Sequence, residues 1–227
     1  MVRAIERFIP SSAATTHDLI RPVAPIALTA SSPAPPWLGP ALLQAPWVVV
    51  RRGPVRDGMI PVGVRGSERC DRFAAFLSVA QVAQRLSPED LDVAAIQQRR
   101  NSVPAIAALA RVVPVLARHG SRWGPGGSVG FEIASGVPTA TPCSDLDLVL
   151  RQNHRLESKE AIELLAALAQ AAAPARIDVM IETPSGGVSL ADLAAMHARV
   201  LVRTPFGPRL LVDPWMMDAT ALLEAAS

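Results

Sequence analysis

The alternation of apolar and polar residues predicts several short elements in the first half of the chain. From Trp47 the segments WVVVRRG and GMIPVGVRG predict two strands around a turn that contains Gly53-Pro54 and Asp57-Gly58. The following stretch, ERCDRFAAFLSVAQVAQRL, has helical spacing of its apolar residues. A further helix is expected to start at Ser87, a capping residue followed by a proline and two acids. These patterns together predict a small α+β domain.

The first forty-odd residues show no such pattern and are rich in Pro, Ala and Ser. We expect residues 17–20, HDLI, to form an ordered island that packs at the periphery. The segment SSPAPPWLGP is expected to be a loop.

The second half contains longer periodic segments. An Ala/Val/Leu-rich helix is expected from Val103 to His119, broken or kinked at Pro114 and ended by Gly120. After a glycine-rich turn, the pattern predicts a strand at DLDLVL, a helix at SKEAIELLAALAQAAAPA, a strand at RIDVMIE, and two strands in VLVRTPFGPRLLV. In the helix, Ile162, Leu165 and Leu168 are expected to share a side. A boundary near residue 100 divides the chain into domains 1–100 and 101–227.

Composition excludes several classes of protein. A net charge of +2 without any run of five Lys or Arg argues against a nucleic-acid partner. Lys159 is the only lysine, and although an arginine excess suits polyphosphate recognition, a coding bias is the stronger interpretation. Cys70 and Cys143 are far apart, which argues against a disulfide scaffold and a zinc site. No signal-peptide core or membrane span is present, so we expect a soluble, cytoplasmic protein without a membrane partner.

Two aspartates stand one residue apart where an apolar strand begins. In a strand, Asp145 and Asp147 point to one face and Leu146, Leu148 and Leu150 to the other. Two carboxylates at this spacing repel each other unless a cation lies beside them. Asp178, on the next predicted strand, can lie next to them in the same sheet. Three such carboxylates can hold two magnesium ions about 3.5–4 Å apart, an arrangement that serves phosphoryl displacement.

The glycine-rich turn before the aspartates adds a phosphate-binding element. Gly127-Ser128 at the start of a helix would present backbone N–H groups and a hydroxyl to a phosphate. Each piece alone has a plainer interpretation: a solvated strand edge, an ordinary turn, or an ion pair between Asp178 and Arg176. The order Gly-Ser, strand DxD, helix, strand Asp is what a nucleotidyltransferase site requires.

These motifs are similar to those of one enzyme family. WGPGGSVGFEIASG, SDLDLVL, RIDVMIETPSGGVSLADL and VLVRTPFGPRL resemble the phosphoribosyl-dephospho-CoA transferases of malonate decarboxylase, also called holo-acyl-carrier-protein synthases. In the first half HDLI, APWVVVRR, IPVGVRGSERCDRFAAFL and LSPEDL are similar too, so the resemblance covers most of the chain. The first dozen residues and the tail after Trp215 match nothing in that pattern, and Asp192 stands where a glutamate is expected.

The resemblance implies a fold and an activity. It implies an α+β protein in which a polymerase-beta-like nucleotidyltransferase domain follows the small α+β domain. The activity would join 2'-(5''-phosphoribosyl)-3'-dephospho-CoA, from its triphosphate precursor, to a serine of the apo acyl-carrier subunit with magnesium, releasing pyrophosphate. Asp145 and Asp147 would be the catalytic metal ligands and Asp178 a further ligand, while Gly127, Ser128 and Ser144 would bind substrate.

The remaining charged residues are less informative. Five arginines near the motifs could each neutralise triphosphate charge, although a surface or structural role is the stronger interpretation for each: Arg122, Arg151, Arg176, Arg203 and Arg209. Arg65, Arg69 and Arg72 are candidates for the CoA phosphates or the carrier. The histidines have no paired ligand at informative spacing and are interpreted as surface or core residues.

Two other functions remain open. A nucleotidyltransferase that uses ATP on another acceptor would share the chemistry, although the first domain argues against it. A non-catalytic metal-binding interaction protein would share only the DxD motif. All three candidate carboxylates are present, which argues against this alternative because a decayed active site need not keep them.

Overall fold

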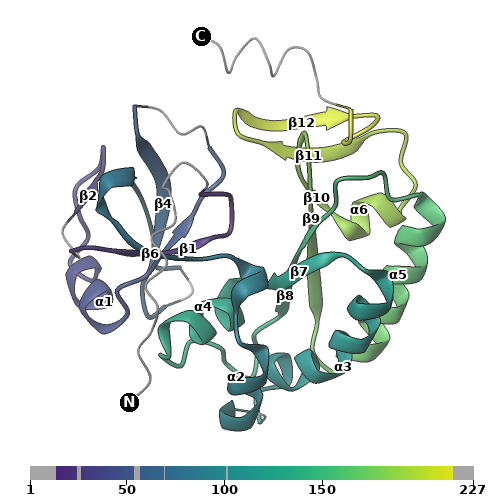
Figure 1. Cartoon of the computed structure of the whole chain (residues 1–227), viewed down its shortest axis with the longest axis horizontal. Helices are drawn as coiled ribbons and strands as arrows, with labels where there is room; N and C mark the ends of the chain where they lie inside the picture. Colours follow the sequence, from purple (N-terminus) through teal and green to yellow (C-terminus); the bar gives the residue numbers. More distant parts are fainter. Residues whose placement is uncertain (1–13, 25–26, 54–56, 69, 101, 217–227) are drawn as a thin grey trace.

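The computed structural model describes residues 14–24, 27–53, 57–68, 70–100 and 102–216. Two six-stranded sheets lie in separate lobes, with their connecting segments and one helix between them (Figure 1). The α+β class and the division into two domains, which the sequence predicts, are confirmed. In the described part of the chain no helix is long and apolar enough to cross a membrane.

The first domain is an antiparallel sheet of strand order β2-β5-β4-β3-β1-β6. Among the described residues of this domain, a short helix and a 3-10 turn accompany the strands. The elements are β1 (Leu19–Pro22), β2 (Leu28–Thr29), α1 (Leu38–Gln44), β3 (Val48–Val50), β4 (Met59–Arg65), β5 (Arg72–Ser78), η2 (Val79–Gln81) and β6 (Val82–Leu86). The two strands expected around the Asp57-Gly58 turn are β3 and β4, and they pair antiparallel.

Three expectations for this domain are wrong. The stretch predicted as a helix after residue 68 forms β5, η2 and β6, because Phe73, Ala75 and Leu77 are buried at a period of two and pair along β4. Residues 17–20 are not peripheral: β1 lies between β3 and β6, and Ile20 is fully buried. The expected loop SSPAPPWLGP ends in a helix, since α1 starts at Leu38.

The second domain has strand order β12-β11-β10-β9-β8-β7, in which β8 and β9 are parallel and the other neighbours antiparallel. The elements are η3 (Pro88–Asp90), α2 (Val93–Arg100), α3 (Pro104–His119), β7 (Arg122–Pro125), α4 (Gly127–Ser135), β8 (Leu146–Arg151), α5 (Ser158–Ala172), β9 (Ile177–Thr183), β10 (Gly186–Ser189), α6 (Leu190–Ala194), β11 (Val200–Thr204) and β12 (Gly207–Leu211). The predicted strands and helices of this half are present, and α3 continues through Pro114 without the expected break. Strands β7 and β10 and helix α6 were not predicted, and β7 forms in the stretch expected to be a glycine-rich turn.

The core of the second domain lies between the sheet and helices α3 and α5. Leu146, Leu148 and Leu150 are buried there, as the strand pattern predicts. Helix α3 ends at Gly120, which adopts the left-handed conformation with φ 75°. The predicted side of α5 is wrong, because Ile162 is 42% exposed and the buried side is formed by Ala161, Leu164, Leu168 and Ala172.

Residues 87–100 connect the two domains. The backbone N–H and hydroxyl of Ser87 donate to the Asp90 carboxylate over 3.1 and 2.6 Å, and these hydrogen bonds lower the Asp90 pKa. This start forms only the turn η3, and the helix that follows is α2. The strands of the first sheet end at Leu86, and Ile96 of α2 belongs to the core of the second domain, while the boundary near residue 100 stays a prediction.

Candidate active site

The glycine-rich turn lies directly against the second aspartate. Strand β7 pairs with β8, and after the strand the Gly126 N–H donates to the Asp147 carbonyl oxygen over 2.9 Å. Gly127 then begins α4 with φ 54°, and a Cβ built on it would overlap Asp147 Oδ2. The N-terminus of α4 is therefore packed on the Asp147 carboxylate, and only glycine fits at position 127.

Asp147 and Asp178 are neighbours on two parallel strands. The β8–β9 register places Asp147 opposite Asp178, so their side chains share one face at the strand spacing of about 4.8 Å. Asp147 is half-buried, and Asp178 is exposed. The sheet thus places Asp178 beside the DxD motif, as the sequence predicts.

Asp145 precedes β8 and has a different partner. Its Oδ1 lies 3.5 Å from Nε of Arg176, whose side chain is 86% exposed. The plainer interpretation of an Asp178–Arg176 pair is wrong, because Arg176 pairs with Asp145. A pair this exposed is worth at most about 1 kcal/mol, so the Asp145 carboxylate can leave Arg176 at little cost.

The three carboxylates lie at the same end of the sheet, but their oxygens do not converge on one position. In the described ranges, no group of three or more His, Cys, Asp or Glu side chains is placed so that it could hold a metal ion. The donor chemistry nevertheless suits magnesium, which prefers carboxylate oxygens.

The two predicted substrate-binding serines differ in their surroundings. Ser128 is 7% exposed, and its hydroxyl makes no hydrogen bond to the described residues. Its carbonyl oxygen accepts a hydrogen bond from Thr139 Oγ1 over 2.8 Å. The Ser144 hydroxyl accepts the Thr141 N–H over 2.9 Å and closes a turn directly before Asp145. Ser128 therefore has a donor available for a ligand, whereas Ser144 shapes the approach to the motif.

Glu132 supports this site and was missed in the sequence. Its side chain is 2% exposed, and its Oε2 accepts the backbone N–H groups of Thr139 and Ala140, each over 2.8 Å. These bonds tie α4 to the loop that leads to Asp145. The available signal was an acid within the apolar helix GSVGFEIAS, because a buried carboxylate requires hydrogen-bond donors.

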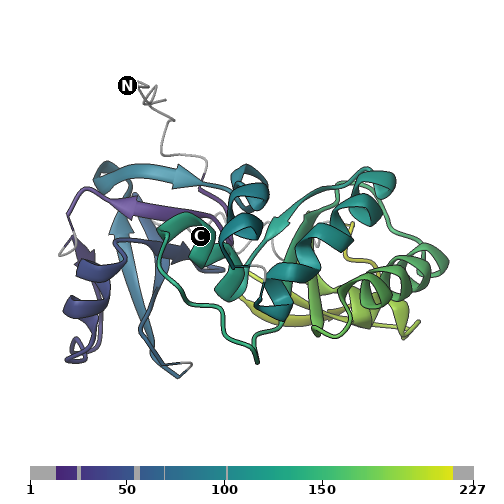
Figure 2. The same ribbon diagram turned by 90° about the horizontal axis from the view of Figure 1, so that it is seen from below.

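Helix α4 also packs on the first domain. Phe131, 4% exposed, lies in one apolar cluster with Leu19 and Trp47 of the first domain. Figure 2 shows α4 between the two sheets. The first domain therefore supports the helix whose N-terminus contacts Asp147.

We expect Phe131→Ala to lower the free energy of unfolding by about 3 kcal/mol and to slow any reaction catalysed at this site, because the cavity loosens α4. Val113→Ala, at a 36% exposed position of α3, is the matched control and should change either quantity far less. Chemical denaturation and steady-state rates measure both effects. Equal losses in the two variants would contradict a special role for this contact.

Charged pairs hold the domains together at the opposite ends of β8 and β9. Arg151 pairs with Glu89 over 2.5 Å and with the fully buried Asp18 over 3.3 Å. Glu182 pairs with Arg52 and lies 2.9 Å from His17 Nε2. His17 and Arg151 are thus structural residues, and Arg151 is engaged away from the carboxylates.

Burial raises the pKa of Glu182, but the hydrogen bonds from His17 and Arg52 lower it by more than burial raises it. The pKa of Glu182 therefore falls to about 2. Burial raises the pKa of Asp18, opposed by Thr15, Arg85 and Arg151. Because the folded-state pKa of Glu182 is below its ordinary value of 4.5, its contribution to stability is present above pH 4.5 and is lost as the pH falls towards 2.

We expect Glu182→Gln to lower the free energy of unfolding by about 3 kcal/mol at neutral pH. The stability of the variant should therefore fall less steeply than that of the wild type between pH 5 and pH 2. Glu163→Gln, whose carboxylate is exposed and 3.9 Å from Lys159, is the control and should keep the wild-type slope. Parallel pH profiles for wild type and Glu182→Gln would refute the assignment.

The other candidate arginines are spread over the molecule. Arg203 lies on β11 with Nη1 3.3 Å from Met180 Sδ, and Arg209 lies on β12. Arg122 is exposed on β7. Arg65 and Arg72 face each other at the end of the β4–β5 pair, and Arg69 lies outside the described residues.

Comparisons with known proteins agree over both domains. Residues 15–88 match the family described as the phosphoribosyl-dephospho-CoA transferase MdcG N-terminal domain, and residues 81–214 match its C-terminal domain. A phosphoribosyl-dephospho-CoA transferase of Pseudomonas putida is 42% identical over 80% of this chain and 86% of the relative. The transferase of Pseudomonas putida strain W619 is 39% identical over 95% of this chain and 100% of the relative. That of Azotobacter vinelandii is 40% identical over 88% of this chain and 93% of its own. No solved structure matches.

These matches cover nearly all of the described chain and place it among the transferases. The chain belongs to the phosphoribosyl-dephospho-CoA transferase family.

Proposed function

We propose that this protein transfers the 2'-(5''-phosphoribosyl)-3'-dephospho-CoA group from its triphosphate precursor to a serine of the apo acyl-carrier subunit of malonate decarboxylase. The observation that carries the proposal is the packing of the α4 N-terminus on Asp147, itself in register with Asp178. The names of the relatives and of the matching family support the donor, and the family name supports the decarboxylase.

The order of elements supports a polymerase-beta-like nucleotidyltransferase domain. Strand β7, the glycine turn, α4, the strand with DxD, helix α5 and the strand with Asp178 follow one another as such a site requires. The leaving pyrophosphate would lie at the α4 N-terminus, where backbone N–H groups, the helix dipole and the Ser128 hydroxyl favour an anion.

The reaction breaks a phosphoanhydride bond of the donor and forms a phosphoester bond to the carrier. The carrier serine oxygen forms a bond to the α-phosphorus, the bond from that phosphorus to the bridging α–β oxygen breaks, and pyrophosphate leaves while the serine proton passes to solvent. Magnesium held by Asp147 and Asp178, with Asp145 turned away from Arg176, would supply neutralising charge to the phosphates. Glu132 and Ser144 keep the loop before Asp145 in place.

Intact mass measurement of the carrier tests the proposal. The purified protein is incubated with the triphosphate precursor, magnesium and apo carrier, and a carrier with its acceptor serine replaced by alanine is the control. We expect a mass increase equal to the phosphoribosyl-dephospho-CoA group on the wild-type carrier alone. No increase with this donor, or an adenylyl adduct formed from ATP instead, would overturn it.

A further inference from the structure

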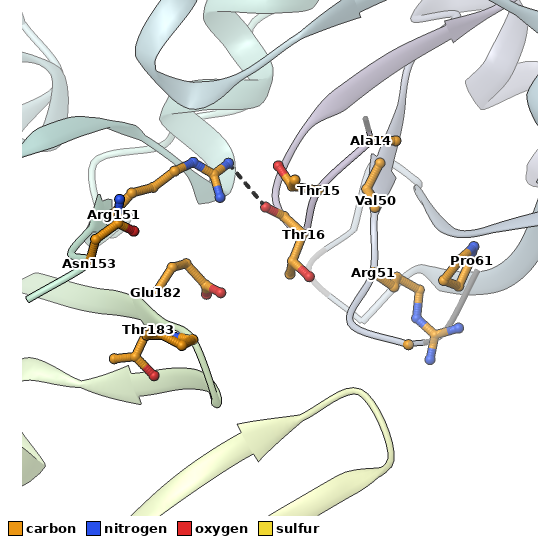
Figure 3. A pocket seen from close by; sticks show the side chains of 12 residues that line it. Ala14, Thr15, Thr16, Val50, Arg51, Pro61, Arg151, Asn153, Glu182 and Thr183 are labelled. Atoms are coloured by element: carbon orange, nitrogen blue, oxygen red, sulfur yellow. Dashed lines mark hydrogen bonds between the residues drawn. The ribbon is translucent and has the colours of Figure 1, made fainter. Parts of the chain in front are cut away.

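A cavity lies between the domains at the far ends of β8 and β9. It has a volume of about 350 Å³, within the usual range for small-ligand sites. Figure 3 shows Thr16 of the first domain facing Glu182 and Asn153 of the second across it. The cavity belongs to no part of the site described above.

Two charged residues that line this cavity, Glu182 and Arg151, are already paired. Glu182 is bound by His17 and Arg52, and Arg151 by Glu89 and Asp18. Arg51 also lines the cavity, but its side chain points away from Glu182 and packs along Gly63 (Figure 3). Thr16 and Asn153 have side chains without hydrogen bonds to the described residues, so the cavity offers uncharged polar groups to a ligand.

Strand β9 connects this cavity to the carboxylates. Asp178, Met180 and Glu182 share one face at a period of two, which separates Asp178 from Glu182 by about 13 Å. The exposed Arg203 lies over the middle of this path, where its Nη1 is 3.3 Å from Met180 Sδ. Gly187 pairs with both Glu182 and Arg203, so Arg203 stands next to the cavity wall.

Arg203 is a cation without an anionic partner in the described part of the chain. A thioether is a weak acceptor, so this contact leaves the guanidinium available for a phosphate. Arg203 contacts Met180, which is two residues from Asp178 on β9, a separation of about 7 Å along that strand. Consider a ligand with one phosphate group at the carboxylates and a second phosphate group farther along β9. Its second phosphate group would contact Arg203.

We propose that Arg203 binds the diphosphate of the dephospho-CoA part of the donor and that the interdomain cavity receives its adenine. This rests on the proposed function, because that donor carries both a triphosphate and a separate diphosphate. The triphosphate lies at the α4 N-terminus, and the adenosine and its diphosphate extend along β9. Arg203 is thus a substrate-binding residue that distinguishes this donor from a plain nucleoside triphosphate.

Binding of 3'-dephospho-CoA and of inorganic triphosphate to the full chain, measured by calorimetry, tests this inference. Arg203→Gln should weaken dephospho-CoA binding about tenfold to a hundredfold and leave triphosphate binding unchanged. Thr16→Val should weaken dephospho-CoA binding as well. Arg118→Gln, at an exposed position of α3 on the other face of the sheet, is the control and should change neither affinity.

Kinetics separates this inference from the proposed function. Arg203→Gln should raise the KM for the donor with a smaller change in kcat. Unchanged dephospho-CoA affinity in Arg203→Gln, with wild-type transfer intact, would overturn the subsite and leave the proposed function standing. Absence of transfer by the wild type would overturn the proposed function itself, whatever the affinities.

Discussion

Replacing Asp147 by Asn is expected to reduce transfer about a thousandfold while the protein stays folded. The amide keeps the size of the side chain but removes the charge that a cation needs beside the triphosphate. Asp178 is adjacent in register, so relief of the repulsion between two like charges should offset the lost contact of the carboxylate with the α4 N-terminus, and the melting temperature should change little. Asp145→Asn should lose a comparable amount of activity, and its exposed pair with Arg176 contributes little to stability.

The control for these variants is Glu163→Gln, which removes an exposed carboxylate of α5. It should keep the wild-type rate and melting temperature. Steady-state rates and thermal unfolding measure both quantities. Transfer by Asp147→Asn within tenfold of the wild type would refute the role of this carboxylate.

Gly127→Ala is expected to reduce transfer by at least about a hundredfold. The added Cβ would overlap Asp147 Oδ2, so the carboxylate or the start of α4 must shift. This reason differs from a simple obstruction of the phosphate, because the methyl group meets the carboxylate first. Ser128→Ala, which keeps the backbone donors, should lose only about tenfold to a hundredfold.

Gly136→Ala is a matched control for this variant. Gly136 ends the same helix with φ 71°, close to the 54° of Gly127, but a Cβ there has nothing within 4 Å. Both variants carry the strain of a left-handed alanine, about 1 kcal/mol, and only Gly127→Ala disturbs Asp147. Equal rates in the two variants would show that backbone strain, and not the contact with Asp147, explains the loss.

The second domain was predictable because its signals are local. Helix α3 follows from its apolar period and from Gly120, and β8 from three leucines at every second position of an otherwise largely apolar run. Parallel pairing of β8 and β9 then follows from the helix between them, and this pairing places Asp178 beside Asp147.

The first domain was less predictable because its apolar residues suit two periods. Phe73, Ala75 and Leu77 alternate in a strand, yet the alanines and leucines of the same stretch also suit a helix. Pairing with β4, the preceding strand, decides between the two structures.

Contacts between the domains were the least predictable feature of the sequence. Phe131 packs on Leu19 and Trp47, and Glu182 pairs with His17 across 165 positions of sequence. A single sequence contains no periodic signal for such pairs. The support that the first domain gives to α4 therefore emerged only from the structure.

Donors labelled with radioactive phosphorus at either the α or the γ position test the central claim most directly. We predict that the wild type transfers the α label to the carrier serine and releases the γ label as pyrophosphate, and that Asp147→Asn does both about a thousandfold more slowly. Transfer of the γ label to the carrier, or α-label transfer by Asp147→Asn within about tenfold of the wild-type rate, would contradict nucleotidyl transfer at this site.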